Sequence, residues 1–326
     1  MRAESTWTDA VVRATRDVAP NIRQIEFAPE RGQVVWTAGS HIDIGVMVDG
    51  RADTRSYSLV GEPDAGCYRV AVKREEQSRG GSRFMWSLKP GSRLSVSAPK
   101  NLFELQVGRP EYLLVAGGIG ITPIVGMAQV LARRGEKFRL YYCGRSRREM
   151  AFLLELFERL GDRLEIFAAD EGHRLNIAEA IAGLARDTEL YLCGPMRLLD
   201  AARQAWAGAG RPATSLRYET FANSGRHAPE RFWVRVPSHG VEIVVPENKT
   251  MLDALNEAGV EVMWDCLRGE CGLCAVDIVE VDGGIDHRDV FLSDHQTGER
   301  QALHLRVARV RRWRGDLHGL PAGLKR

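Results

Sequence analysis

Tyr112-Leu113-Leu114-Val115-Ala116-Gly117-Gly118-Ile119-Gly120-Ile121-Thr122-Pro123 decides how the middle of the chain folds. It opens with an apolar run of strand length and ends in Thr122-Pro123, a favourable helix start with a hydroxyl cap and a residue whose fixed φ suits the first turn. The glycines between them, Gly118 and Gly120 included, let a ligand approach the backbone, and a helix N-terminus favours a pyrophosphate. The stretch therefore predicts a strand, a phosphate-binding turn and a helix.

The chain that follows alternates apolar strands with amphipathic helices. The expected elements are a helix over Thr122–Arg134, a strand over Phe138–Cys143, a helix over Met150–Leu160, strands over Leu164–Ala169 and Glu189–Leu192, a helix from Pro195 and a strand over Leu216–Phe221. Such alternation is typical of a parallel sheet that helices cover on both faces. We therefore expect an α/β domain over residues 105–224.

The first hundred or so residues follow a different pattern. Short segments carry alternating or β-branched residues, and Gly, Pro and Asp punctuate the gaps between them. These segments are Val11–Asp17, Ile22–Phe27, His41–Val48, Tyr68–Lys73 and Arg93–Ser97. Their spacing predicts a small antiparallel β-barrel over residues 1–104.

A third unit is expected after the aperiodic stretch Asn223–Pro229, over residues 225–326. It has strand patterns over Phe232–Val236 and Val241–Val245, followed by a helix that begins at Thr250. Asp253 stands where a capping box places its carboxylate, although Glu or Gln is usual there. The predicted fold class is thus multidomain: an antiparallel β-barrel, an α/β parallel-sheet domain and an α+β domain.

Three cysteines crowd into Cys266-Leu267-Arg268-Gly269-Glu270-Cys271-Gly272-Leu273-Cys274. This is the C-x4-C-x2-C spacing of plant-type 2Fe–2S ferredoxins, and glycines suit a loop that must turn tightly around a cluster. Structural zinc is the alternative, but zinc sites favour paired C-x2-C or Cys/His spacings. The triplet therefore predicts Cys266, Cys271 and Cys274 as cluster ligands in a ferredoxin-like domain.

The fourth ligand of such a cluster is missing from its expected place, since no cysteine follows Cys274. In the ferredoxin pattern it lies on a later β-strand, which we expect here over Ala302–Arg309, and Arg306 stands at its position. Protonated guanidinium is a poor metal ligand. His304 would share a strand face with Arg306, and imidazole ligates iron in Rieske centres. Either three thiolates and a substitute hold the cluster, or the cluster is weakened or absent.

Composition excludes several classes of function. The 45 basic and 43 acidic residues nearly balance, which argues against a nucleic-acid partner. The most basic stretch, Arg306–Arg314, is either a solvated strand end or a docking patch for an acidic partner. No run approaches the ~18 apolar residues of a membrane helix, and Met1–Trp7 lacks the apolar core of a secretory signal, so we expect a cytoplasmic protein with no membrane partner. In that compartment the 6 cysteines are expected to be thiols or metal ligands.

Four further motifs, taken in sequence order, give the chain a family resemblance. They are Arg55-Ser56-Tyr57-Ser58-Leu59, the glycine-rich turn quoted above, Cys193-Gly194-Pro195 and Tyr218-Glu219-Thr220-Phe221. With the cysteine triplet, they make the chain resemble the reductase components of two-part aromatic-ring oxygenases and demethylases, the group of phthalate dioxygenase reductase and vanillate demethylase reductase. The likeness spans nearly all 326 residues and implies the order flavin domain, nicotinamide domain, ferredoxin domain.

The resemblance implies an FMN site in the barrel. Arg55 would meet the phosphate and Ser56, Tyr57 and Ser58 would line the isoalloxazine, because a phosphate suits a planar charged fork and a flavin an aromatic platform. The other residues that it implies are Val72, Lys73, a second phosphate contact formed by Arg79, Gly80, Gly81 and Ser82, and Phe221 near the ring. A phosphate-sized site without an adenylate-binding extension favours FMN over FAD. The alternatives are an ordinary barrel strand with a surface arginine, and a Phe221 that is simply core.

The resemblance also implies how NAD(P)H is bound. Gly118, Gly120, Thr122 and Pro123 would hold the pyrophosphate, while Cys193, Gly194 and Pro195 would form the turn whose thiol lies beside the nicotinamide. A buried thiol in a βα turn is the alternative for Cys193. Arg145-Ser146-Arg147-Arg148 follows the second strand of the sheet, where the adenosine ribose would lie; its arginines could accept a 2′-phosphate, but the family favours NADH. Cys193, Ser58 and Phe221 are the implied catalytic residues.

Three functions follow from these expectations. The leading hypothesis is electron transfer from NAD(P)H through FMN to a 2Fe–2S cluster and on to a Rieske-type oxygenase. The second is an NAD(P)H diaphorase whose third domain only docks a partner, because Arg306 replaces the expected cysteine. The third is an iron–sulfur sensor or scaffold, against which the intact flavin and nicotinamide motifs count.

Overall fold

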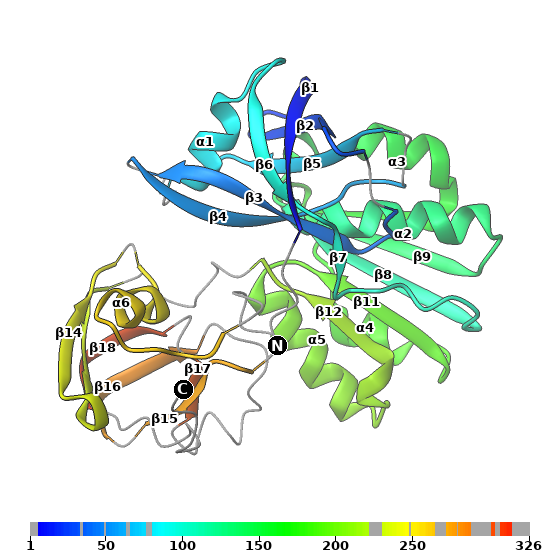
Figure 1. Ribbon diagram of the computed structural model, residues 1–326. Coiled ribbons are helices and arrows are strands. Elements are labelled where there is room, and N and C mark those ends of the chain that lie inside the picture. Colours follow the sequence, from blue (N-terminus) through cyan, green and yellow to red (C-terminus); the bar gives the residue numbers. More distant parts are fainter. Residues whose placement is uncertain are drawn as a thin grey trace. The chain divides into compact units, whose positions relative to one another are not determined.

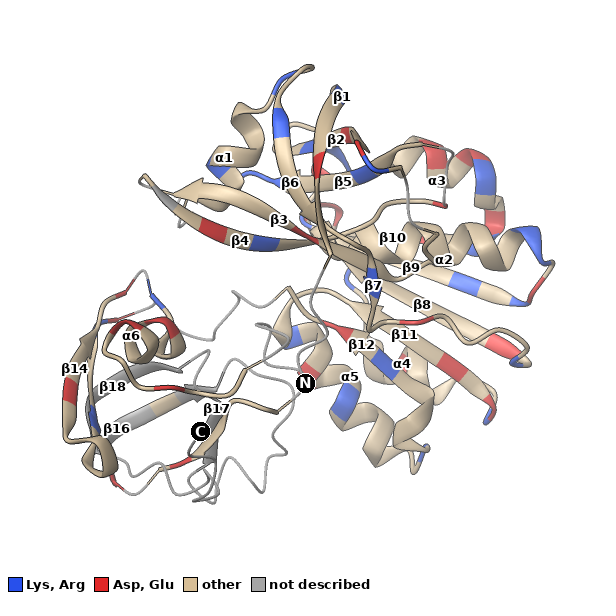
Figure 2. Ribbon diagram, viewed as in Figure 1, with Lys and Arg blue, Asp and Glu red and all other residues tan. Residues whose placement is uncertain are grey.

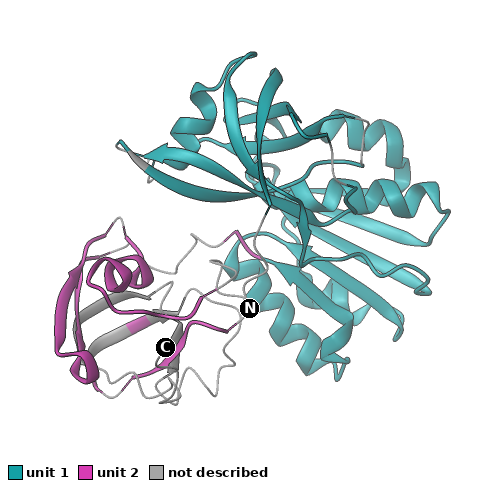
Figure 3. Cartoon of the chain, viewed as in Figure 1, with its two compact units in different colours: residues 1–219 teal, residues 220–326 magenta. Residues whose placement is uncertain are grey.

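The chain forms two compact units, Met1–Glu219 and Thr220–Arg326 (Figure 3). The structure, a computed structural model, describes residues 6–32, 35–48, 50–62, 66–75, 80–221, 230–247, 249–264, 272–278, 280–287, 301–303 and 307–314. Some candidate site residues lie outside these ranges: Arg79, Cys266, Cys271, His304 and Arg306. The finer domain boundaries expected near residues 104 and 224 stay predictions.

The first unit begins with an antiparallel barrel. Its strands are β1 (Trp7–Ala19), β2 (Ile22–Pro29), β3 (Ser40–Val48), β4 (Arg51–Ser58), β5 (Tyr68–Lys73), β6 (Arg93–Ser97) and β7 (Lys100–Asn101), with helix α1 (Gly81–Ser87) between β5 and β6. The strand order is β4-β3-β6-β1-β2-β5, with β7 beside β3, and a bridge between Leu59 and Val70 joins the two ends (Figure 1). The predicted barrel is confirmed.

The barrel interior is filled by alternate side chains of its strands. Phe27, Ile42 and Ile44 are fully buried, and each such side chain contributes about 1.5–3 kcal/mol relative to exposure. Strand β4 was not among the predicted strands, because its sequence RADTRSYS lacks an apolar alternation. It pairs with β3 along its whole length, from His41 opposite Ser58 to Val48 opposite Arg51.

The second half of the first unit is a parallel sheet. Its strands are β8 (Glu111–Gly117), β9 (Phe138–Gly144), β10 (Leu164–Ala168), β11 (Thr188–Cys193) and β12 (Leu216–Glu219), in the order β10-β9-β8-β11-β12. Helices α2 (Ile121–Arg133) and α3 (Leu153–Leu160) cover one face, and α4 (Ile177–Ala182) and α5 (Met196–Gly208) the other (Figure 1). The predicted α/β architecture is confirmed, although the short helix α4 was missed.

Two helix starts differ from expectation. The cap expected at Thr122 is wrong, because the 3₁₀ turn η1 (Gly118–Gly120) runs directly into α2 and Gly120 is the N-cap. The Thr122 hydroxyl instead donates to the Ile119 carbonyl at 3.1 Å. Helix α3 begins at Leu153 rather than Met150, since Phe152 has a left-handed backbone (φ 61°) that interrupts the helical geometry.

The second unit combines a mixed sheet, a short ribbon and one helix. Its elements are β13 (Phe232–Val236), β14 (Val241–Val245), α6 (Met251–Glu257), β15 (Ala275–Asp277), β16 (Glu280–His287), β17 (Gln301–Leu303) and β18 (Val307–Arg314). The larger sheet has the order β14-β13-β18-β16, and β15 pairs with β17. The predicted capping box is confirmed: the Thr250 hydroxyl accepts from the Asp253 amide at 3.0 Å, and the Asp253 carboxylate accepts from the Thr250 amide at 3.4 Å.

The strand expected over Ala302–Arg309 is described only at its two ends. Ala302 and Leu303 belong to β17, which pairs with β15, and Val307 to Arg309 belong to β18, which pairs with β16 and β13. His304 and Arg306 lie outside the described ranges, so the strand face that they would share stays a prediction.

Remaining 3₁₀ turns link these elements: η2 (Arg147–Glu149), η3 (Gly161–Arg163), η4 (Ala169–Glu171), η5 (Ala213–Ser215) and η6 (Pro237–His239). Basic and acidic residues are intermixed over the first unit, as Figure 2 shows along α2, α3 and the neighbouring loops. Within the described ranges, the helices are too short or too polar to cross a membrane.

Candidate functional site

Arg55 on β4 lies against the first residue of helix α1. A Cβ atom added to Gly81 would lie 2.8 Å from the Arg55 Nε, and one added to Gly80 would lie 2.6 Å from Cγ1 of Val48. Gly80 also has a left-handed backbone with φ 100°, which favours glycine. The structure thus brings Arg55, the first predicted phosphate contact, beside Gly80 and Gly81 of the second, and the left-handed backbone of Gly80 favours glycine at the start of the helix.

The other residues of the Arg55–Ser58 motif alternate in environment. Tyr57 is half-buried against the barrel core, and burial raises the pKa of its phenol, which therefore stays neutral. Ser56 is exposed and donates to the Asp43 carboxylate at 2.5 Å. Ser58 is buried and donates to Oε2 of Glu219 at 3.3 Å. Among these residues, the half-buried ring of Tyr57 is the apolar aromatic surface that a flavin platform requires.

Glu219 is a site residue that sequence reasoning missed. It is 2% exposed at the end of β12, where its register neighbour on β11 is Cys193. Its bond to Ser58 joins the barrel to the parallel sheet and lies beside the predicted nicotinamide thiol. The E-x-F motif was the available signal, but only Phe221 was given a role from it. Phe221 itself is half-buried and belongs to the second unit, so its place near the ring stays a prediction.

Val72 and Lys73 are the last residues of strand β5. Hydrogen bonds of Val72 and of nearby Glu75 connect the end of this strand to α1. The Val72 carbonyl accepts from Trp86 Nε1 at 3.0 Å, and the Lys73 ammonium pairs with Glu75 at 3.0 Å. The Glu75 amide donates to the Ser82 hydroxyl at 3.3 Å. These contacts hold the end of β5 beside α1, while the predicted flavin contacts of Val72, Lys73 and Ser82 stay predictions.

Backbone segments at the carboxyl ends of β8 and β11 touch each other. A Cβ atom on Gly120 would lie 2.2 Å from the Cys193 carbonyl oxygen, and one on Gly117 would lie 2.5 Å from Cδ of Pro195. One on Gly194 would lie 3.0 Å from the Gly117 Cα. The predicted nucleotide turn and the Cys193-Gly194-Pro195 turn therefore lie at one edge of the sheet, where ligands of such sheets bind. Cys193 is fully buried there.

Arg145 and Ser146 follow β9, as predicted. The ion pair in this loop is formed by the next arginine, Arg147. The Arg147 Nε donates to both Glu171 oxygens, at 2.8 and 3.0 Å. Arg145 is exposed, and its carbonyl accepts from the Asp170 amide at 3.0 Å. The Arg147 side chain is therefore held toward Glu171, whereas the exposed side chain of Arg145 lies at the end of β9, where the adenosine ribose is expected.

Cys274 is the one thiol of the triplet that the described ranges contain. It is 1% exposed and packs with Leu252, Val262 and Trp264. The turn before it is tight, since Gly272 has φ 75° and its carbonyl accepts from the Ala275 amide at 3.0 Å. A thiol enclosed by apolar side chains fits a cluster ligand, because such surroundings exclude water from the metal.

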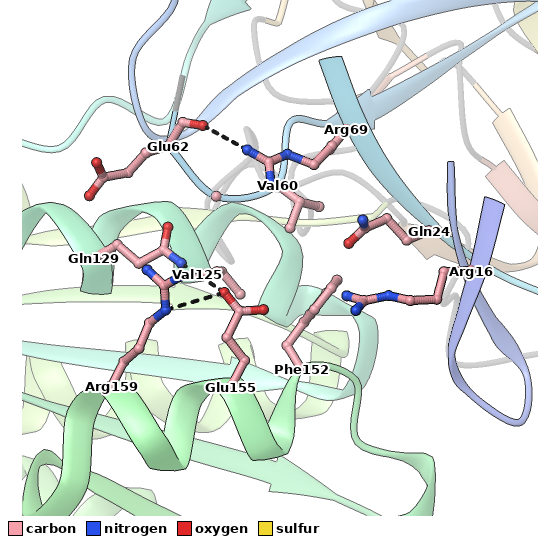
Figure 4. Close-up of a pocket in the computed structure, with 11 residues that line it drawn as sticks. Arg16, Gln24, Val60, Glu62, Arg69, Val125, Gln129, Phe152, Glu155 and Arg159 are labelled. Carbon is pink, nitrogen blue, oxygen red and sulfur yellow. Dashed lines mark hydrogen bonds and ion pairs between the residues drawn. The ribbon is translucent and has the colours of Figure 1, made fainter. Parts of the chain in front are cut away.

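A separate polar cavity of about 230 Å³ lies between the barrel and helices α2 and α3 (Figure 4). Arg16, Arg69 and Gln24 line it from the barrel side. From the helices, Glu155 accepts from the Gln129 amide at 3.3 Å and pairs with Arg159 at 3.5 Å. None of the predicted site residues lines it, so this cavity is distinct from the predicted cofactor sites.

Comparison with known proteins gives two domain matches. Residues 114–204 match the oxidoreductase NAD-binding domain, and residues 234–305 match the 2Fe-2S iron-sulfur cluster binding domain. The second match covers Cys266, Cys271 and Cys274 as well as His304. The chain therefore contains both a nucleotide-binding and a cluster-binding domain, in the predicted order.

The chain is also similar to other known proteins over most of its length. It is 37% identical to the vanillate O-demethylase oxidoreductase of a Pseudomonas species over 88% of this chain and 92% of that protein. It is 36% identical to the heme-dependent oxidative N-demethylase beta subunit of Ectopseudomonas mendocina over 90% of this chain and 93% of that subunit. The solved structure of phthalate dioxygenase reductase matches with a TM-score of 0.75 and 28% identity over 95% of this chain and 98% of that one. The chain belongs to the oxidoreductase family of phthalate dioxygenase reductase and vanillate O-demethylase oxidoreductase.

Proposed function

We propose that this chain is the reductase component of a two-component oxygenase or demethylase, and that it moves electrons from NAD(P)H through FMN to a 2Fe–2S cluster and on to the oxygenase. The hydrogen bond between Ser58 and Glu219 supports the first step most directly. Ser58 belongs to the predicted flavin motif on β4, and Glu219 is the register neighbour of Cys193, the predicted nicotinamide residue. The flavin site and the nicotinamide site, between which a hydride would pass, would therefore lie next to each other.

The residues of the first unit fit the groups that this function needs. Arg55 and the glycine start of α1 would hold the flavin phosphate, and Tyr57 would cover the ring. Ser58 and Glu219 can hold a proton between a hydroxyl and a carboxylate in a buried place. The glycine contacts at the ends of β8 and β11 would bring the dinucleotide close to the backbone. A bound flavin supplies the chemistry of accepting a hydride and releasing electrons singly.

FMN rather than FAD is part of this proposal. The phosphate residues Arg55, Gly80 and Gly81 suit a single phosphate, as do Arg79 and Ser82 of the same motif. Heat extraction of the purified protein followed by mass spectrometry identifies the flavin, and recovery of FAD alone would overturn the assignment.

The cluster is assigned to Cys266, Cys271 and Cys274, with His304 or Arg306 at the fourth position. The cluster-domain match over residues 234–305 supports this, and the buried thiol of Cys274 is compatible with it. Iron and sulfide analysis, together with low-temperature EPR of the dithionite-reduced protein, tests it. A protein that contains flavin but gives no EPR signal would be a diaphorase, the function that the arginine at position 306 favours.

We propose a Rieske-type oxygenase as the electron acceptor and NADH as the donor, with the protein in the cytoplasm. The relatives are subunits of oxygenase systems of more than one kind, a vanillate O-demethylase and a heme-dependent oxidative N-demethylase among them. Reduction of a Rieske oxygenase by NADH in the presence of this protein supports the proposal. If the protein reduced a haem oxygenase but no Rieske oxygenase, the partner would be a haem oxygenase instead.

The decisive experiment for the first step is anaerobic stopped-flow absorbance. Mixing with NADH should bleach the flavin absorbance, followed by reduction of the cluster. NADPH is the matched comparison and should react more slowly, because the family resemblance favours NADH. A flavin that neither nucleotide bleaches would refute the proposed function.

A further inference from the structure

Two buried tyrosine hydroxyls hold the backbone of the segment that connects the barrel to the parallel sheet. This linker, residues 102–110, runs from the end of β7 to the start of β8. The Tyr191 hydroxyl accepts from the Gln106 amide at 2.8 Å and lies 3.3 Å from the Glu104 carbonyl, to which it can donate. The Tyr112 hydroxyl accepts from the Arg109 amide at 2.8 Å and donates to the Gln106 carbonyl at 3.0 Å. An irregular segment thus obtains its hydrogen bonds from neighbouring strands of the sheet.

A buried carboxylate anchors the same segment. Glu189 on β11 is 1% exposed, and its Oε2 forms an ion pair with the Arg109 Nε at 2.9 Å. Its Oε1 accepts from the Arg217 Nε at 2.5 Å and lies 3.4 Å from the Tyr191 hydroxyl. Because Glu189 is buried while Arg109 is partly exposed, loss of the arginine would leave a buried carboxylate with less compensation of its charge. The linker is therefore fixed by a side-chain ion pair as well as through its backbone.

Tyr191 is fixed in turn by its surroundings. Its ring contacts the ring of the linker residue Phe103, with centroids 5.6 Å apart. Burial raises the pKa of its phenol to about 12, so the hydroxyl remains protonated and able to donate at neutral pH. Because one proton serves the hydroxyl, Tyr191 donates either to Glu104 or to Glu189 while it accepts from Gln106.

The position of Tyr191 on β11 connects this anchoring to the candidate site. Tyr191 and Cys193 lie two residues apart on one strand, hence on the same face and about 7 Å apart along it. The linker is the covalent link from the barrel, which carries Ser58, to the sheet, which carries Cys193. The linker is therefore one of the connections between the predicted flavin motif and the predicted nicotinamide thiol, together with the hydrogen bond from Ser58 to Glu219.

We propose that Tyr191 is a positioning residue for hydride transfer: its hydroxyl fixes the linker and thereby the distance between the flavin and nicotinamide sites. The inference rests on the proposed function. Hydride transfer depends steeply on the separation of donor and acceptor, and a misplacement of about 1 Å can cost about a hundredfold in rate. Tyr191 acts on this separation without touching either reacting group.

The test compares Tyr191→Phe with Tyr142→Phe. The first substitution keeps the ring that contacts Phe103 and removes only the hydroxyl. The second removes one buried hydroxyl of the same sheet, which donates to the Ala151 carbonyl at 3.3 Å, outside the linker. Tyr191→Phe loses more hydrogen bonds than Tyr142→Phe and should lower the thermal midpoint further, so reaction rates are compared well below both midpoints.

Two measurements separate positioning from stability. Hydrogen exchange followed by mass spectrometry should show faster exchange over residues 102–110 in Tyr191→Phe but not in Tyr142→Phe, because the Gln106 amide loses its acceptor in the first variant. Stopped-flow flavin reduction by NADH should slow by about tenfold in Tyr191→Phe, with KM for NADH changed less than about twofold, since the nucleotide turn is untouched. Tyr112→Phe should change both readouts in the same direction.

The outcomes distinguish this inference from the proposed function. Faster linker exchange with a wild-type rate of flavin reduction in Tyr191→Phe would overturn the positioning role. An equal loss of rate in Tyr142→Phe would reduce the effect to general stability and also overturn it. Wild-type protein whose flavin is not reduced by NADH would refute the proposed function, whatever the exchange data show.

Discussion

Replacing Gly120 with alanine should destabilise the first unit, because the added methyl group has no space. The Cβ atom would lie 2.2 Å from the Cys193 carbonyl oxygen, 2.5 Å from the Cys193 carbonyl carbon and 2.9 Å from the Gly194 nitrogen. All three are backbone atoms of the facing turn, so no side-chain rotation relieves the overlap. Gly120 itself has φ −62°, a conformation that alanine adopts freely, so the substitution tests space alone.

Overpacking that displaces backbone costs up to about 3 kcal/mol, and we expect about 2–3 kcal/mol here. For a unit of this size, each kcal/mol lowers the thermal midpoint by about 2–4 °C, which gives a decrease of about 4–12 °C. Because the Cys193-Gly194-Pro195 turn must move, Gly120→Ala should also weaken NADH binding, measured by titration of protein fluorescence.

Gly208→Ala is the matched control. Gly208 is the last residue of α5, and an added Cβ atom would have no neighbour within 4 Å. Alanine in a helix is favoured over glycine by about 0.8–1 kcal/mol, so this variant should be as stable as the wild type or more stable. The reasoning would be refuted if Gly120→Ala unfolded at the wild-type temperature, or if both variants lost stability equally.

Further predictions concern the hydroxyl and thiol groups. Ser58→Ala should slow flavin reduction by NADH about tenfold or more in stopped-flow measurements, because the buried bond to a carboxylate is lost; an unchanged rate would exclude Ser58 from proton transfer. Burial raises the pKa of the Cys143 thiol to about 12, so little thiolate forms below that pH; iodoacetamide should label Cys143 at pH 8 much more slowly in folded than in urea-unfolded protein, and equal rates would contradict this. Cys274→Ser should abolish the EPR signal of the reduced cluster, while NADH still bleaches the flavin; a retained signal would remove Cys274 from the ligand set. Arg306→Cys should raise iron and sulfide per chain, and lower values would mean that the ligand position was wrongly assigned.

The architecture was predictable because local patterns report burial. Alternation in the barrel segments and apolar runs in the sheet both depend on which faces are covered, and neighbouring residues reveal this. Strand β4 was missed for the same reason, since its polar residues show no apolar face. The start of α2 was misplaced because the glycine turn itself winds into the helix, so Thr122 lies inside it.

Site residues could be predicted where the spacing of glycines or cysteines indicates a ligand. They could not be predicted where residues far apart in the sequence contact each other. Ser58 and Glu219 are 161 residues apart, and nothing local at Glu219 indicates that its carboxylate receives a hydroxyl from the barrel. In the sequence, Tyr191 and Tyr112 look like ordinary core residues of apolar strands. Their hydrogen bonds become visible only when the linker is placed against the sheet.

The linker contacts also set an order of assembly. All strands of the barrel lie between residues 7 and 101, so each finds its partners early as the chain is synthesised from its N-terminus. The amide of Gln106, by contrast, must wait for a hydroxyl 85 residues later in the chain. Contacts of such long sequence separation form slowly, because loop closure precedes any gain from them. The joint that aligns the two halves of the first unit is therefore completed after the barrel, when the last central strand of the sheet has been made.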